Sequence, residues 1–388
     1  MKVALVILHA DPARGGAERY TIDLAGALVK RGHEVALLAS SFGEEVAGVR
    51  QQLLDAGGAT RARRYLRFLD SLDAHLVSND YDIVHAMLPV RRCDVYHPHA
   101  GLAAEALARG HLKHRGAIPR TLSQLANRFN PRRQQFGEVE RRLLRSPTPP
   151  VVLCLSDYVK ATVRTHYPEL PEECLTKLFN ATDLDRFDPT TRPTAGEGVR
   201  QRFGFSPDDV VGLMLAQDFQ RKGLKESIIA LADVADPRLK LLVAGKQNPS
   251  GYRRLAENVG IGRQVCFAGA TNDPYAFYRA ADFLILPTWH DPCSLVVLEA
   301  IAMGLPVIST AMNGACEIMQ SDIHGYVIPD PADRPALAQA LGRLLDSPRR
   351  KQMSLACLSL RPALSYENHL QALEQAYGRI KRYRPPRP

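Results

Sequence analysis

The chain contains 388 residues, of which 45% are hydrophobic and 23% are charged, as in ordinary globular proteins. This length exceeds the size at which one hydrophobic core stops growing, so we expect two domains. No apolar stretch reaches the ~20 residues of a membrane helix, and the first residues lack the pattern of a signal peptide, so we expect a cytoplasmic protein. The seven cysteines are scattered, without a C-x-x-C pair, which argues against a disulfide framework and a zinc site.

The net charge of +9 is concentrated in one segment. Residues 101–150 hold ten Lys and Arg against three Glu, and leucines are interspersed among the cations. Three interpretations stay open: an anionic surface at the inner face of the cytoplasmic membrane, a phosphorylated glycolipid acceptor, or an ordinary solvated face. Nucleic acid is disfavoured as a partner, because no recognised binding motif accompanies the charge.

The first half of the chain begins with a strand, a loop, a helix and a second strand. The apolar run at 2–8 predicts a strand that is buried on both faces of a parallel sheet. Residues 17–32 have helical spacing and end at a glycine. Further strands are predicted at 33–40, 81–88 and 150–157.

The second half restarts the same alternation after a stretch rich in Pro, Gly and Thr near residue 190. Strands are predicted at 210–218, 239–246, 264–270 and 283–289, and helices at 221–236, 273–282 and 332–347. Strands that alternate with helices in two successive sets predict two doubly wound α/β domains that face each other.

Two acids bracket an apolar segment of the second half. In DPCSLVVLEAIAMGLPV, Asp291 and Glu299 stand eight positions apart, and a Gly-Leu-Pro-Val turn follows. Glu299 lies inside an apolar run, so we expect it to be partly buried and to have a partner. The alternative is that Asp291 only caps a helix and Glu299 is a surface acid.

This motif and the strand–helix order around it resemble the retaining nucleotide-sugar glycosyltransferases of family 4, which have the GT-B architecture. The similarity runs from the first strand to about residue 345, and the chain looks most like the lipopolysaccharide core glucosyltransferases. The resemblance implies two Rossmann-like domains across a cleft. Residues 1–185 would form the acceptor side, with 365–388 packing back on it, and residues 186–364 would bind the nucleotide sugar.

The resemblance assigns the two acids to different parts of one donor. Asp291 would meet hydroxyls of the transferred sugar, although the family usually has the longer Glu there, and Glu299 would take the ribose hydroxyls. Hydrogen bonds from hydroxyls to a carboxylate are charge-assisted and therefore strong. The backbone N–H groups of the helix that begins between the acids would hold the diphosphate; they belong to Ser294, Leu295 and Val296.

A basic pair and a glycine pair precede two other predicted helices. By resemblance, Arg221 and Lys222 neutralise the diphosphate leaving group, whereas the alternative is an exposed helix start. Gly15 and Gly16 follow the first strand at a helix N-terminus, where the backbone can approach a phosphate or a sugar. A plain loop turn explains these two glycines about equally well.

Two histidines follow a predicted strand where the family often has a residue that contacts the donor sugar. We favour His99 for this contact, with His97 as the second choice. In an extended chain their side chains point to opposite faces, so both cannot line one pocket. A metal site there lacks further ligands at a suitable spacing.

Two further segments resemble the family but receive weaker assignments. Asn180 and Asp183 match its interdomain segment, and we interpret the Asp-Leu-Asp triplet at 183–185 as structural although it imitates a metal-binding Asp-x-Asp. Glu317 is a weaker candidate than Glu299 for a contact with the donor.

The predicted function is a retaining, metal-independent transfer of a hexose from a nucleoside-diphosphate sugar, with UDP-glucose the best candidate. The nucleotide sugar is a co-substrate, and no cofactor is expected. The acceptor would be a hydroxyl of a glycan or glycolipid such as lipopolysaccharide core. The alternatives are a non-catalytic carbohydrate-binding scaffold, and a sugar-nucleotide epimerase or a phosphorylase on the same fold.

Overall fold

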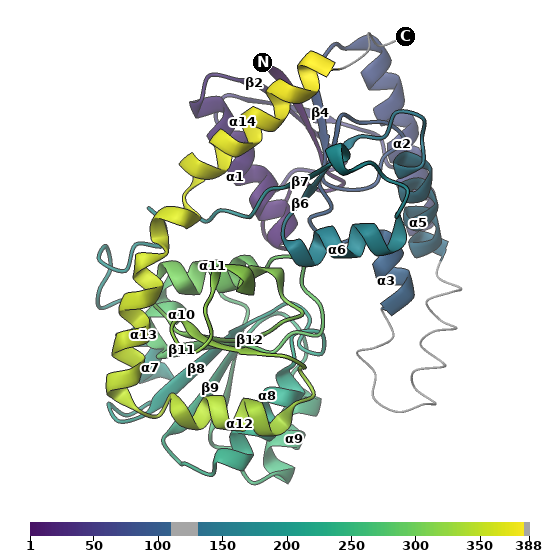
Figure 1. Cartoon of the computed structure of the whole chain (residues 1–388). Helices are drawn as coiled ribbons and strands as arrows, with labels where there is room; N and C mark the ends of the chain where they lie inside the picture. Colours follow the sequence, from purple (N-terminus) through teal and green to yellow (C-terminus); the bar gives the residue numbers. More distant parts are fainter. Residues whose placement is uncertain (110–130, 384–388) are drawn as a thin grey trace. The chain divides into compact units, whose positions relative to one another are not determined.

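The computed structural model describes residues 1–109 and 131–383, and contacts divide the chain into two compact units (Figure 1). The first unit contains residues 1–179 and 367–388, and the second contains 180–366. The predicted boundary after residue 185 therefore falls inside the second unit. The second unit starts earlier because Asn180 Nδ2 donates to the Cys293 carbonyl (3.1 Å) and the Thr182 N–H donates to the Leu364 carbonyl (3.0 Å).

The first unit is built on a seven-stranded parallel sheet in the order β3-β2-β1-β4-β5-β6-β7. Its strands are β1 (Lys2–Val6), β2 (Glu34–Ala39), β3 (Val49–Leu53), β4 (Ile83–Ala86), β5 (Val95–Tyr96), β6 (Val151–Cys154) and β7 (Leu175–Lys177). Its helices are α1 (Gly16–Lys30), α2 (Arg61–Ser78), α3 (Ala103–Arg109), α5 (Pro131–Leu144), α6 (Asp157–His166), the short η1 (Glu172–Cys174) and α14 (Tyr366–Tyr383).

Burial explains the positions of these elements. The central strands β1 and β4 are mostly apolar and buried, whereas β3, with the sequence VRQQL, is only partly buried at the sheet edge. Helix α2 places Tyr65, Phe68 and Leu72 in the core against the sheet. Although α14 comes last in the chain, it packs back on this unit beside α1 (Figure 1), where Tyr20 of α1 meets His369 of α14.

The second unit is built on a six-stranded parallel sheet in the order β10-β9-β8-β11-β12-β13. Its strands are β8 (Val210–Leu215), β9 (Leu239–Ala244), β10 (Val265–Gly269), β11 (Phe283–Leu286), β12 (Val307–Thr310) and β13 (Gly325–Ile328). Its helices are α7 (Glu197–Arg202), α8 (Leu224–Val234), α9 (Ser250–Asn258), α10 (Pro274–Ala280), α11 (Leu295–Ala302), η2 (Gly314–Ile318), α12 (Arg334–Arg343), α13 (Ser347–Ser359) and η3 (Arg361–Leu364).

Each sheet has a point at which the strand order changes direction. It lies between β1 and β4 in the first unit and between β8 and β11 in the second. In open α/β sheets, ligands bind outside the carboxyl ends of the strands at this point. The segments after β1, β4, β8 and β11 are therefore the places to look for functional side chains.

The predicted fold class, two doubly wound α/β units, is confirmed, and each predicted strand is present. Helix α2 and the short strands β3 and β7 were not predicted. The centre of the basic segment, 110–130, lies outside the described residues, so the interpretations of that segment stay untested. Among the described residues, no helix is long and apolar enough to cross a membrane.

Candidate functional site

A buried ion pair lies at the switch point of the second sheet. Lys222 follows β8 and Asp291 follows β11, and the Lys222 Nζ donates to Asp291 Oδ2. The two residues are only 8% and 6% exposed. A buried charge is costly without an opposite charge, so each member of this pair requires the other.

Gly223 fixes the position of Lys222. Its φ of 77° is left-handed, and a Cβ there would lie 2.2 Å from the Pro287 carbonyl oxygen, in the segment that follows β11. Only glycine accepts both the backbone conformation and the close approach. The turn therefore brings the end of β8 against the end of β11 and aims Lys222 at Asp291.

The ion pair is charged at neutral pH. Burial raises the pKa of the Asp291 carboxyl, but Lys222 and Arg221 outweigh burial and hold this pKa below its usual value. Burial lowers the pKa of the Lys222 ammonium, and Asp291 partly opposes that effect. An ammonium has three N–H donors, so Lys222 can bind a second anion while it bonds to Asp291.

Arg221 lies beside the ion pair but makes its hydrogen bonds to other groups. Its guanidinium donates to the His290 carbonyl (3.1 Å) and lies 3.8 Å from Asp218. Its own backbone carbonyl accepts from the N–H of Trp289. Arg221 is half-buried, so the two basic residues predicted together do not share one partner.

Asp291 does not cap a helix, so the alternative interpretation of this residue as a helix cap is wrong. Helix α11 begins at Leu295 with Ser294 as its N-cap, and Asp291 pairs instead with Asn313 as an isolated parallel bridge. The Ser294 N–H donates to Asn313 Oδ1 (3.2 Å) and is not available as predicted. The N–H groups of Leu295 and Val296 have no acceptor among the described residues.

Glu299 lies on α11, partly buried, as predicted from its apolar surroundings. A partner was expected for Glu299, and the structure shows Tyr278 of α10 in this position: its hydroxyl donates to Glu299 Oε2 (2.6 Å). Burial, followed by the charge of Glu299, raises the pKa of Tyr278 well above its usual value, so the phenol stays protonated. Tyr278 therefore fixes the direction of the Glu299 carboxylate.

The remaining polar candidates of the second unit have structural positions. Asn180 holds the segment before α11 through Cys293, and its own Oδ1 is buried without a partner. Asp183 accepts hydrogen bonds from the N–H groups of Asp185 and Arg186, as a turn residue does. Glu317 is exposed. Within 1–109 and 131–383, no group of three His, Cys, Asp or Glu could hold a metal ion.

In the first unit, Gly15 and Gly16 start α1 directly after the segment that follows β1. Gly15 is the N-cap, without a side-chain cap, and its φ of 172° is ordinary extended backbone. A Cβ at Gly15 would lie 3.1 Å from Glu18 Oε2. Neither glycine is required by backbone conformation, so the structure leaves both interpretations of this loop open.

His97 and His99 follow β5 in a tight turn, not in an extended chain. The His99 N–H donates to the His97 carbonyl (2.7 Å), and the two ring centroids lie 4.6 Å apart. The premise that they point to opposite faces is therefore wrong. Both Nε2 atoms are buried without a partner, and His97 is fully buried whereas His99 is 9% exposed. Of the two residues, only His99 is exposed at all, and its Nε2 atom is buried.

The two rings belong to a larger buried cluster that the sequence did not indicate. Tyr20 packs on His99 with ring centroids 3.9 Å apart, and its hydroxyl bonds to His369 Nε2 at 2.7 Å. His97 Nδ1 lies 3.1 Å from His85 Nε2, and His85 Nδ1 lies 2.6 Å from the Tyr377 hydroxyl. These six residues are called the histidine cluster below.

Burial keeps the histidine cluster uncharged. It lowers the pKa of His85 to about 3 and that of His369 to about 4. Burial and the neighbouring histidines hold the pKa values of His97 and His99 well below the usual range. At neutral pH the rings therefore act as neutral hydrogen-bonding groups.

The structure thus brings together Lys222 with Asp291, and places Glu299 on α11, the helix that follows Asp291. Sequence reasoning missed Tyr278, Tyr20 and His369. The only available signal for them was a tyrosine or histidine on the apolar face of a helix, which usually indicates core packing.

Comparisons with known proteins agree with this architecture. A model of the group 1 glycosyl transferases matches residues 197–356, and a model of glycosyltransferase family 4 matches residues 14–186. The lipopolysaccharide glucosyltransferase WaaG of Escherichia coli is 27% identical over 341 residues, which are 87% of this chain and 88% of WaaG.

Two solved structures share the fold. A crystal structure of WaaG, a glycosyltransferase involved in lipopolysaccharide biosynthesis, matches with a TM-score of 0.80 and 26% identity over 97% of this chain and 99% of that chain. Anabaena Alr3699/HepE, solved in complex with UDP-glucose, matches with a TM-score of 0.74 and 17% identity over 97% and 100% of the two chains. The second similarity concerns the fold alone.

Proposed function

Because the chain belongs to the group 1 and family 4 glycosyltransferases of the GT-B fold, we propose that it transfers a hexose from a nucleoside-diphosphate sugar to a hydroxyl of a glycan or glycolipid. UDP-glucose is the proposed donor and lipopolysaccharide core the proposed acceptor, since the relative WaaG is a lipopolysaccharide glucosyltransferase. The proposed site of action is the inner face of the cytoplasmic membrane.

The observation that carries this proposal is the buried ion pair of Lys222 and Asp291 at the switch point of the second sheet. Lys222 is held by Gly223 and Asp291, so its charge is already oriented before a ligand arrives. Oriented charge in a site of low dielectric stabilises a developing anion without reorganisation at the moment of reaction. The anion that develops in sugar transfer is the departing nucleoside diphosphate.

The proposed reaction proceeds with retention and without a metal ion. The bond between the anomeric carbon and the phosphate oxygen breaks, a bond from that carbon to the acceptor oxygen forms, and the acceptor proton passes to the departing phosphate. Lys222 and Arg221 stabilise the phosphate, together with the free N–H groups of Leu295 and Val296. Asp291 and His99 bind hydroxyls of the transferred hexose.

Glu299 is proposed to bind the ribose hydroxyls of the donor. Tyr278 holds one carboxylate oxygen. A carboxylate has about four acceptor positions, which leaves capacity for hydroxyl donors. Gly15 and Gly16 are proposed to approach the diphosphate through their backbone.

The test is titration of the full chain with UDP-glucose, GDP-mannose and related donors, with slow donor hydrolysis as a second measurement. We expect one donor to bind, and we expect Glu299→Ala to weaken that donor and its free nucleoside diphosphate alike. Glu257→Ala, at an exposed acid of α9 in the same unit, is the control. If no nucleotide sugar binds, or if Glu299→Ala changes nothing, the proposal fails and a non-catalytic scaffold becomes the better explanation.

A further inference from the structure

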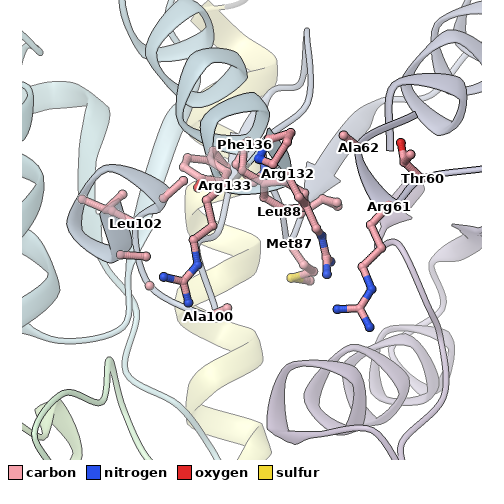
Figure 2. A pocket seen from close by; sticks show the side chains of 16 residues that line it. Thr60, Arg61, Ala62, Met87, Leu88, Ala100, Leu102, Arg132, Arg133 and Phe136 are labelled. Atoms are coloured by element: carbon pink, nitrogen blue, oxygen red, sulfur yellow. The ribbon is translucent and has the colours of Figure 1, made fainter. Parts of the chain in front are cut away.

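A cavity of about 560 Å³ lies in the first unit, at the carboxyl ends of β4 and β5 (Figure 2). Met87, Leu88 and Pro89, which follow β4, line it, and so does Tyr96 of β5. Its volume is in the range typical of small-molecule pockets. Because it adjoins the switch point of the first sheet, it occupies a position where open α/β sheets bind ligands.

Three arginines line the cavity and give it a strong positive charge. Arg61 comes from the first turn of α2, and Arg132 and Arg133 come from the first turn of α5. Figure 2 shows their guanidinium groups projecting to the same side of the cavity. Within the part of the chain that the structure describes, neither Arg61 nor Arg132 forms an ion pair with a carboxylate.

The buried carboxylate behind the cavity does not neutralise these arginines. Glu140 is fully buried and accepts hydrogen bonds from the hydroxyls of Tyr96 (2.6 Å) and Tyr167 (3.0 Å). It also accepts from the N–H groups of Ala103 and Ala104. All of its partners are groups other than the arginines, so Glu140 leaves the charges of Arg61 and Arg132 uncompensated.

The arginines stand where cations are unfavourable. Neither α2 nor α5 has an acid in its first turn, and the N-terminus of a helix carries a partial positive charge. Burial, and then the charges of Arg61 and Arg14, lower the pKa of Arg132. Two positive helix ends and crowded guanidinium groups together favour an anion as the partner of Arg61 and Arg132.

The rest of the wall is mostly apolar, which limits the kind of anion that fits. Phe136 stacks on Tyr65 with ring centroids 4.1 Å apart, and Arg132 lies 5.3 Å above the Phe136 ring. Leu102 and Met87 add further apolar surface. Such a wall suits the C–H face of a sugar ring, whereas the arginine side suits a group with more than one negative charge.

We propose that this pocket binds a phosphoryl group carried by the sugar acceptor, held by Arg61, Arg132 and Arg133 while the sugar ring lies against Phe136 and Met87. A phosphate monoester has a charge of about −1.5 to −2 at pH 7 and three acceptor oxygens. The planar guanidinium group binds such oxygens in pairs. The inference rests on the proposed function, because it names the acceptor of the same transferase.

The test uses glucose 6-phosphate and glucose as probes for calorimetric titration of the full chain, in the presence of saturating UDP so that a donor site cannot contribute. We expect glucose 6-phosphate to bind much more tightly than glucose or inorganic phosphate, and to weaken as salt is added. Arg132→Gln and the more exposed Arg61→Gln should each weaken glucose 6-phosphate about tenfold, as expected for loss of one charge-assisted hydrogen bond. Arg63→Gln, in the same turn of α2 but outside the cavity wall, should have no effect.

Several outcomes would overturn this assignment. If inorganic phosphate binds as tightly as glucose 6-phosphate, the pocket is an anion site without a sugar. If Arg61→Gln and Arg132→Gln both leave binding unchanged, the phosphate lies elsewhere. If these variants reduce binding to phosphatidylglycerol vesicles but not to glucose 6-phosphate, the arginines face a membrane. Failure of the donor titration with Glu299→Ala would instead contradict the proposed transferase and leave this pocket standing as a phosphosugar site.

Discussion

Two groups of polar side chains are buried at strand ends, one in each unit, and they avoid the cost of an unpaired buried charge in opposite ways. The pair of Lys222 and Asp291 lies at the strand ends of the second sheet and is charged. The histidine cluster lies at the strand ends of the first sheet and is neutral. Both are removed from water, which penalises charge. The second unit offsets the penalty with an opposite charge, and the first unit avoids it by keeping each ring unprotonated.

This difference determines what each group can do. A preformed ion pair can stabilise a charge that arrives or develops next to it. Neutral imidazoles and phenols can only donate and accept single hydrogen bonds, so they orient a ligand without neutralising it. The second unit therefore contains a group that can neutralise an anion, and the first unit contains a group that can only orient a ligand.

The contrast between the charged pair and the neutral histidine cluster is tested most directly by removing one charge from the pair. We expect Lys222→Met to destabilise the second unit by about 3–5 kcal/mol, because Asp291 is left buried and unpaired. The double variant Lys222→Met with Asp291→Leu should recover most of that loss yet stay inactive. The single tryptophan, Trp289, lies beside the pair, so urea unfolding followed by its fluorescence measures the effect. Lys225→Met, an exposed lysine of α8, is the control. A Lys222→Met protein as stable as this control would show that the pair is not charged.

A smaller loss is expected when the turn that aims Lys222 is changed. Gly223→Ala places a Cβ 2.2 Å from the Pro287 carbonyl oxygen in a backbone with positive φ. We expect a loss of at least about 2 kcal/mol, together with weaker donor binding. Gly204 also has a positive φ, of 66°, but a Cβ there meets nothing within 4 Å, so Gly204→Ala should lose only about 1–2 kcal/mol and keep donor binding. Equal losses in the two variants, measured by urea unfolding, would contradict the close approach at Gly223.

The histidine cluster should be sensitive to acid, which sharpens the contrast with the ion pair. The folded pKa of His369, about 4, is below the value of about 6.5 for an unfolded histidine, so the unfolded state binds more protons between these pH values. Stability should therefore be complete above pH 6.5 and should fall as the pH falls below it, by about 1.4 kcal/mol per pH unit for each such histidine.

The variant His369→Gln isolates one of these histidines. Its amide can donate to the Phe179 carbonyl and accept from Tyr20, as the ring does, but it does not titrate. We expect the fall in stability between pH 6.5 and 5 to be less steep than in the unchanged chain, measured by urea unfolding and circular dichroism. Tyr20→Phe removes a hydrogen bond without removing a titrating group, so it should lower stability equally at each pH. A His369→Gln protein with an unchanged pH profile would mean that the pKa of His369 is the same in the folded and the unfolded chain.

The alternation of strands and helices could be predicted from the sequence because burial on both faces of a parallel sheet produces continuous apolar runs. Strands such as β8 and β11 carry this signal along their whole length. Strand β7 has only three residues and β3 is a polar edge strand, so neither produces a pattern long enough to recognise. Helix α2 went unrecognised although its buried residues recur at helical spacing.

The sequence indicated individual candidate residues but not the contacts that they make in the structure. Glu299 was expected to need a partner because it interrupts an apolar run, yet nothing in the sequence identified Tyr278. Lys222 and Asp291 are 69 positions apart, and Tyr20 and His369 are 349 apart. Such pairs are created by the order of strands in the sheets and by the return of α14, which local patterns do not encode. The tight turn at His97 was missed for the same reason: it is set by the contacts of its neighbours.

The smallest expected effect tests the link between Tyr278 and Glu299. Tyr278→Phe removes the hydroxyl that holds Glu299 Oε2, so we expect a loss of about 1 kcal/mol in stability and a severalfold weaker affinity for the nucleotide sugar and for its free nucleoside diphosphate. Tyr275→Phe removes a similar hydrogen bond from the same helix, to the Asp188 carbonyl at 2.8 Å, without touching Glu299. The two variants should lose similar stability in urea unfolding, and calorimetric titration should find weaker donor binding only for Tyr278→Phe. Weaker binding in both would mean that α10 acts through its general packing, and that Tyr278 does not orient the carboxylate proposed to bind the ribose.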